Sequence, residues 1–202
     1  MKRPIVTLLT LLCVLVGYGQ TGSEVLSQMG NKLGAMDAYR IDFELEMPGT
    51  TDSSKGYCVV DGDKYIISID DLRQGCDGEV VWTLNGANRE VTFDTPRTES
   101  RSLFDNPTKA FDFTAELFAV ESITTTQRDK WQLVLRPTEG VLDGIEKVVV
   151  IVDKESLLPT MLGYDMAGVG LAVNIKKIAP QTSTSNFKPT IPDGYEVLDF
   201  RE

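Results

Sequence analysis

The sequence predicts an α+β fold in which helices cover one face of a strongly curved antiparallel β-sheet. Three observations predict it: an amphipathic helical stretch at the front, many short strand signals separated by turns, and an apolar but irregular interruption in the middle. A sheet of that kind must bury one face against other elements, and the helices are the available cover. After loss of an N-terminal leader, about 180 residues remain, which suits a single domain.

Residues 1–19 have the pattern of a signal peptide. Two basic residues come first, an uncharged apolar run follows at Ile5–Val16, and Gly17 and Gly19 have the small-residue spacing of a cleavage site. The apolar run is too short to make a good transmembrane span. We therefore expect an exported protein whose mature domain is residues 20–202.

The mature chain is predicted to begin with a helix over 23–36, capped by Ser23, because its apolar residues return at helical intervals. Residues 39–47 then alternate apolar and charged side chains, as a strand with one buried face does. Residues 110–120 are apolar without alternation and are predicted to form one or two short helices. Further strands are predicted at 56–60, 65–69, 79–84, 89–93, 131–135, 145–152, 157–166, 169–178 and 196–200.

The centre of the sheet is predicted around Trp82. Asp77-Gly78 and Asn85-Gly86 tolerate positive φ, so each marks a tight reversal between strands. The strands beside these turns are rich in aromatic and aliphatic residues. This hairpin is either the interior of a sheet or the wall of a binding site.

Charge and composition exclude several classes of function. The net charge is −10, and removal of Lys2 and Arg3 with the leader makes it −12, which disfavours nucleic acid and anionic membrane surfaces as partners. The chain has no histidine, so it has neither a Ser-His-Asp triad nor a Cys/His metal site. Acidic pairs such as Asp70-Asp71 fall at turns, where Asp is common. We expect no enzyme, no metal and no cofactor, although a hydrolase with Glu or Lys as its base remains open.

Two cysteines, Cys58 and Cys76, remain after processing. Export permits a disulfide between them. A simple meander of strands would place them two strands apart, roughly 9–10 Å, which exceeds the usual Cα separation of a bridge. We expect two buried free thiols, with the disulfide as the alternative.

The irregular region between the two groups of strands is unusually apolar for a surface connection. One interpretation is ordinary core that packs on the sheet. The other is a movable cover over an apolar cavity. The residues concerned are Phe104, Phe111, Phe113, Leu117 and Phe118.

Four stretches share a pattern with one known family. They are the strand at 39–43 after the first helix, the hairpin at 56–67, the Asp-Gly-x-x-x-Trp hairpin at 77–92 and the closing segment at 187–197. In order and spacing they resemble the periplasmic lipoprotein carriers of the LolA/LolB type. The resemblance covers nearly the whole mature chain.

This resemblance implies an unclosed half-barrel around a hydrophobic cavity, covered by the N-terminal helix and short lid helices. It implies a monomeric carrier or chaperone in the periplasm of a Gram-negative bacterium, without cofactor. Such a carrier receives the acyl chains of lipoproteins from an inner-membrane release complex and delivers them to an outer-membrane receptor. The alternative is an envelope sensor or interaction module on the same scaffold, which binds lipid or lipoprotein without transferring it.

One turn departs from the family pattern. The family has an Arg-Pro turn in its second hairpin, whose Arg holds the lid closed, whereas residues 60–64 here read Val-Asp-Gly-Asp-Lys. The contact that holds the lid is therefore missing or comes from elsewhere, for example from Lys64 or Arg73.

The lipid-binding residues are predicted from alternate positions of the central strands and from the irregular region. A shift of one residue in register would move each strand residue to the other face. The predicted cavity wall is Phe43, Leu45, Tyr57, Val59, Ile67, Trp82 and Leu84, and the predicted lid is Phe104, Phe111, Leu117 and Phe118.

Overall fold

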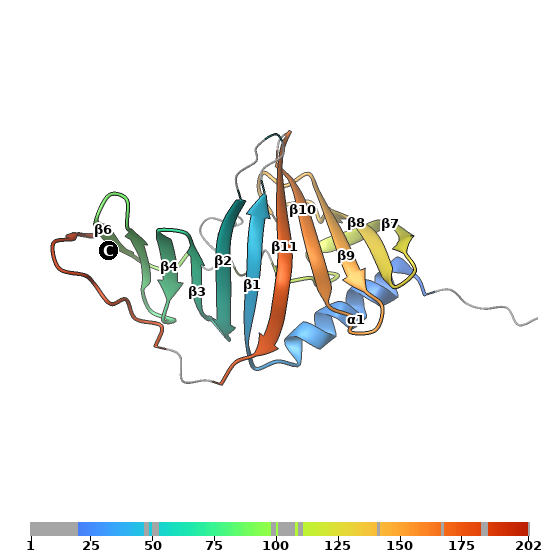
Figure 1. The fold of residues 1–202 in the computed structure, drawn as a ribbon, viewed down its shortest axis with the longest axis horizontal. Helices are drawn as coiled ribbons and strands as arrows, with labels where there is room; N and C mark the ends of the chain where they lie inside the picture. Colours follow the sequence, from blue (N-terminus) through green and yellow to red (C-terminus); the bar gives the residue numbers. More distant parts are fainter. Residues whose placement is uncertain are drawn as a thin grey trace, which may run out of the picture.

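One open, curved sheet organises the computed structural model of the protein, with a helix packed across one of its faces (Figure 1). The structure describes residues 20–46, 49, 53–97, 100, 108, 111–140, 142–166, 168–182 and 186–201. The predicted leader and the predicted lid residue Phe104 lie outside these residues. The α+β class and the unclosed half-barrel are confirmed.

The described elements follow the chain in two groups of strands after the helix. They are α1 (Gly22–Gly34), β1 (Ala38–Glu46), β2 (Ser53–Asp61), β3 (Lys64–Ile69), β4 (Leu72–Cys76), β5 (Val81–Asn85), β6 (Glu90–Asp94), β7 (Phe118–Gln127), β8 (Lys130–Pro137), β9 (Lys147–Asp153), β10 (Pro159–Met166), β11 (Val169–Pro180) and β12 (Glu196–Asp199). Their order across the sheet is β12-β6-β5-β4-β3-β2-β1-β11-β10-β9-β8-β7. Two meanders, β1–β6 and β7–β11, therefore meet where β1 pairs with β11.

The N-cap of helix α1 lies two residues before the predicted cap. Thr21, not Ser23, is the N-cap: its hydroxyl accepts from the Glu24 amide at 3.2 Å, and the Glu24 carboxylate accepts from the Thr21 amide at 2.8 Å. This reciprocal pair is a capping box. The predicted apolar stripe is confirmed, because Val25, Leu26, Met29 and Leu33 are all buried against the sheet.

Of the predicted short helices over 110–120, the described residues show only 3₁₀ geometry at Phe111. Residues 112–117 are irregular, and β7 begins at Phe118. The sequence pattern misled because these apolar residues pack individually into the core rather than along one face of a helix. Strand β7 itself was not predicted, since most of its side chains after Val120 are polar and exposed.

The register of the sheet fixes which side chains share a face. Ile41 of β1 lies opposite Cys58 of β2, which lies opposite Ile67 of β3, and all three pack in the cluster that also contains α1. We call this side of the sheet the helix face. The other side is the outer face, where Val59, Ile66 and Trp82 form a second cluster with Phe187.

Both predicted thiols are free and buried, so that prediction is confirmed. Cys58 is opposite Ile67, whereas Cys76 is opposite Tyr65, so strand β3 separates the two cysteines. Burial raises the pKa of the Cys58 thiol from 9.0 to about 12.

The raised pKa of Cys58 predicts a loss of stability at alkaline pH. In the unfolded chain the thiol titrates near 9.0, so above that pH the unfolded state loses its proton while the folded state keeps it. The stabilising contribution is complete below pH 9.0 and decreases as the pH rises toward 12. Urea unfolding at pH 8 and about pH 10.5 should show a larger loss for the wild type than for Cys58→Ala. Equal losses in the two proteins would contradict this prediction.

Candidate functional site

The helix face carries a large apolar cluster to which the helix, the strands of both meanders and residues 111–118 all contribute. Val148, Val150 and Val152 of β9 alternate toward it, and each has 0% of its surface exposed. No polar or charged residue is buried among the residues that the structure describes. A face of this kind has the chemistry to bind apolar chains.

Residues 111–117, which we call the lid segment, cover this cluster without joining the sheet. Phe111 is 4% exposed, and its ring centroid lies 6.1 Å from that of Phe43 on β1. Phe113 is 1% exposed and lies 6.2 Å, centroid to centroid, from Phe118. Burial of aromatic rings therefore holds the lid segment in place.

The lid segment also rests on helix α1 at a glycine. A Cβ added at Gly30 would lie 2.7 Å from the carbonyl oxygen of Phe113, closer than such atoms approach in proteins. At Gly34, one turn further along the helix, an added Cβ would meet nothing within 4 Å. Only a residue without a side chain allows the backbone of the lid segment to lie this close to the helix.

The described residues of the predicted site divide between the two faces of the sheet. Phe43, Leu45, Ile67, Phe111, Leu117 and Phe118 pack on the helix face. Tyr57, Val59, Trp82 and Leu84 pack on the outer face. The placement of these four in one cavity wall with Phe43 is therefore corrected: Tyr57 and Val59 lie opposite Asp42 and Arg40 of β1, and these positions alternate with Phe43 and Ile41.

The outer-face cluster is covered by the segment that leads to the C-terminus. The indole nitrogen of Trp82 donates a hydrogen bond of 2.7 Å to the carbonyl oxygen of Phe187. The ring lies over Gly75 of β4, where an added Cβ would be 2.4 Å from the indole. Trp82 is 2% exposed, so it is a structural anchor for the C-terminal segment in this structure.

The sequence suggested Lys64 or Arg73 as the residue that holds the lid closed, but neither side chain lies on the helix face. Lys64 precedes Tyr65 of β3, which faces the helix, and Arg73 precedes Gln74 of β4 in the same way. The guanidinium of Arg73 lies 5.8 Å from the ring centroid of Trp82 on the outer face. This interpretation of Lys64 and Arg73 is wrong because strand alternation directs both away from the lid segment.

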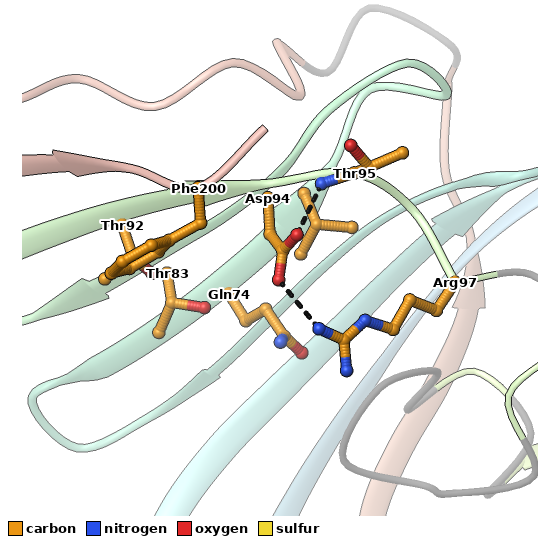
Figure 2. Close-up of a pocket in the computed structure, with 8 residues that line it drawn as sticks. Gln74, Thr83, Thr92, Asp94, Thr95, Arg97 and Phe200 are labelled. Carbon is orange, nitrogen blue, oxygen red and sulfur yellow. Dashed lines mark hydrogen bonds and ion pairs between the residues drawn. The ribbon is translucent and has the colours of Figure 1, made fainter. Parts of the chain in front are cut away.

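At its β4–β6 end the helix face becomes polar and contains a pocket of about 100 Å³ (Figure 2). Gln74, Thr83 and Thr92 line it from three adjacent strands. Asp94 accepts a 2.8 Å hydrogen bond from the Thr95 amide and pairs with Arg97 at 3.4 Å. The sequence prediction did not include this pocket.

Among the described residues, no helix is long and apolar enough to cross a membrane. Within the same residues, no three His, Cys, Asp or Glu side chains are grouped so that they could hold a metal ion.

The half-barrel that the four sequence stretches imply is the architecture that the structure shows. The chain shares this fold with a protein of known structure. Among solved structures it is similar to an uncharacterized conserved protein from Thermus thermophilus, with a TM-score of 0.56, 9% identity and coverage of 87% of this chain and 97% of that one. No protein-family model and no curated protein matches the sequence.

Two further solved structures are similar at lower TM-scores. One is a putative outer membrane lipoprotein-sorting protein domain from Vibrio parahaemolyticus, with a TM-score of 0.45, 14% identity and coverage of 81% of this chain and 94% of that chain. The other is a LolA superfamily protein from Nitrosomonas europaea, with a TM-score of 0.42, 9% identity and coverage of 81% and 95%. At these identities the likeness concerns the fold alone.

Several residues of the helix face were absent from the predicted site. Phe113 was recognised as an apolar residue of the irregular region but not as part of the lid. The alternating valines of β9 and the stripe of α1 carried a visible signal in the sequence, because both follow the period of their element. That they share a face with Phe43 depends on the β1–β11 pairing, which no local pattern reveals.

Proposed function

We propose that this protein is a periplasmic carrier that binds the acyl chains of lipoproteins on its helix face and delivers them toward the outer membrane. The observation that supports the proposal is the apolar cluster of that face, which continues into a lid segment outside the sheet. In this proposal an inner-membrane release complex supplies the cargo, an outer-membrane receptor accepts it, and the carrier acts as a monomer.

The physical requirement for such a carrier is apolar surface that a ligand can reach. Exposure of an acyl chain to water costs about 0.8 kcal/mol per CH₂ group, so a carrier must offer a comparable apolar area. Phe111 and Phe113 supply such area on a segment that belongs to no strand. When Phe111 and Phe113 move, acyl carbons can replace their rings against Phe43 and α1, because neither residue belongs to a strand.

We also propose that the protein binds its ligand without chemical conversion. A carrier needs an apolar site and a route for release, and it needs no general base or nucleophile. The absence of histidine from the sequence is consistent with this role.

The direct test is lipid binding by the natively purified protein. We expect mass spectrometry to detect co-purified lipid and a fluorescent fatty acid to bind and be displaced by acylated peptides. If no lipid co-purifies and the fatty acid does not bind, the carrier proposal fails. Transfer of bound lipopeptide to acceptor vesicles that contain outer-membrane extract then separates a carrier from a sensor, which would bind without transfer.

The contact between Gly30 and the lid segment provides a matched pair of variants for this assay. Gly30→Ala adds a methyl group that collides with the Phe113 carbonyl, whereas Gly34→Ala adds the same methyl group in open space. We expect Gly30→Ala to accelerate uptake of the fluorescent fatty acid by at least about two-fold, because it weakens the covered state. Gly34→Ala should leave the uptake rate unchanged. Equal rates in the two variants would show that the lid segment does not limit access.

A further inference from the structure

A single row of side chains across the helix face changes from apolar to polar along its length. From β1 to β3 the directly opposed residues are Ile41, Cys58 and Ile67, and all of them belong to the apolar cluster. The row continues on β4, β5 and β6 as Gln74, Thr83 and Thr92. The helix face is therefore amphipathic along the sheet, with its polar end at the pocket described above.

The polar pocket is contiguous with the apolar cluster. Val81 of β5 lines the pocket and also packs against the cluster of the helix face. On β4 its cross-strand neighbour is Cys76, a buried member of the same cluster. A ligand with one apolar and one polar part could occupy both sites without leaving the face.

The groups in the pocket both donate and accept hydrogen bonds. A threonine hydroxyl can do either, and a glutamine amide offers both a carbonyl and an NH₂ group. In the part of the chain that the structure describes, the hydroxyls of Thr83 and Thr92 bond to no other side chain. In the view of Figure 2, Gln74 is drawn between Thr83 and the guanidinium group of Arg97, and Thr92 lies on the far side of Thr83 from Arg97.

The two charged side chains of the pocket are paired with each other, which disfavours an ionic ligand. The Asp94 carboxylate faces Arg97, and the two side chains are 40% and 64% exposed at the rim. An anion would meet Asp94 and a chain of net charge −10, whereas a cation would meet Arg97. Phe200, which is 59% exposed, adds an apolar wall. Mixed donors and acceptors beside an aromatic ring match a neutral group whose hydroxyls are separated by C–H surface.

We propose that this pocket binds a neutral polyol, and that the polyol is the headgroup of the lipid whose chains lie on the apolar part of the helix face. The volume of about 100 Å³ is roughly two-thirds of the 150 Å³ that accommodates a benzene ring, which suits a glycerol unit or one edge of a sugar. The claim that the polyol is part of a lipid rests on the carrier function proposed above. The claim that the pocket recognises a polyol rests on the pocket alone.

The test compares two ligands with the same acyl chain in displacement of a fluorescent fatty acid. Monooleoylglycerol carries two neighbouring hydroxyls, and methyl oleate carries none. We expect the wild type to prefer monooleoylglycerol and the double variant Thr83→Val/Thr92→Val to lose about five-fold or more of that preference, with unchanged affinity for methyl oleate. Valine keeps the β-branched shape, so the strands should remain intact.

Thr124→Val, at an exposed position of β7, is the matched control and should keep the full preference. The same preference in the wild type and the double variant, or no preference in either, would overturn the proposal.

A second arm separates failure of the pocket from failure of the carrier function. If the fluorescent fatty acid does not bind at all, the carrier proposal fails. In that case free glycerol and glucose are titrated into the protein, and the amide resonances of Thr83 and Thr92 are followed by NMR. Shifts that are absent in the double variant would support a free polyol as the ligand. No shift with either compound would refute recognition of a polyol by this pocket.

Discussion

Trp82→Ala should lower the free energy of unfolding by roughly 3–5 kcal/mol, the range for removal of a buried large aromatic ring. The ring is 2% exposed, rests on Gly75 and donates its hydrogen bond to the carbonyl of Phe187. Its loss leaves a cavity on the outer face and a carbonyl without its donor. Urea denaturation followed by circular dichroism measures the change, and limited proteolysis should show earlier cleavage of the C-terminal segment.

Trp82→Phe separates the contribution of the buried ring from that of the hydrogen bond to Phe187. Phenylalanine keeps most of the apolar contact but cannot donate to Phe187, so we expect a loss of about 1–3 kcal/mol from the unpaired carbonyl and the smaller ring. Because Trp82 lies on the outer face, both variants should leave fatty-acid affinity unchanged at temperatures where they are folded. A specific loss of affinity in the folded Trp82→Phe variant would mean that the ligand binds the outer face instead.

Phe113→Ala should have a comparable effect on stability but a different effect on binding. Its ring is 1% exposed between the lid segment and the apolar cluster, so we expect a loss of roughly 3–5 kcal/mol. The resulting space on the helix face should raise affinity for the fluorescent fatty acid, because an acyl chain no longer has to displace this ring. Calorimetry and fluorescence titration measure the two quantities.

Phe200→Ala is the matched control for the stability measurement. Phe200 is 59% exposed, so its truncation should change the free energy of unfolding by less than about 1 kcal/mol. If Phe113→Ala cost no more than Phe200→Ala, the lid segment would not be held by aromatic burial.

The helix α1 and most strands could be predicted from the sequence because their periodicities are local. The stripe of α1 and the alternation of β1 each follow from one buried face. Strand β2 shows where this approach fails: Tyr57 to Val60 are apolar at consecutive positions, because both faces of the strand are covered. No alternation marks the helix face of such a strand, and four of the seven residues of the predicted cavity wall were therefore placed on the wrong face.

The candidate site depended on contacts between distant parts of the chain. The cover over Trp82 comes from Phe187, and the apolar neighbours of Phe43 include Phe111. The polar pocket was missed because Gln74, Thr83 and Thr92 are ordinary strand residues one by one. They form a group only through the register of three strands, which sequence patterns do not determine.

The position of β12 has a consequence for when the protein can fold. This strand pairs in parallel with β6, and the backbone of Phe200 donates to the carbonyl of Phe93 at 2.8 Å. In the same way, Ile41 near the start of the sheet pairs with Ile178 of β11. Contacts so distant in sequence form slowly. A chain that emerges N-terminus first can therefore complete this sheet only after its last residues have emerged.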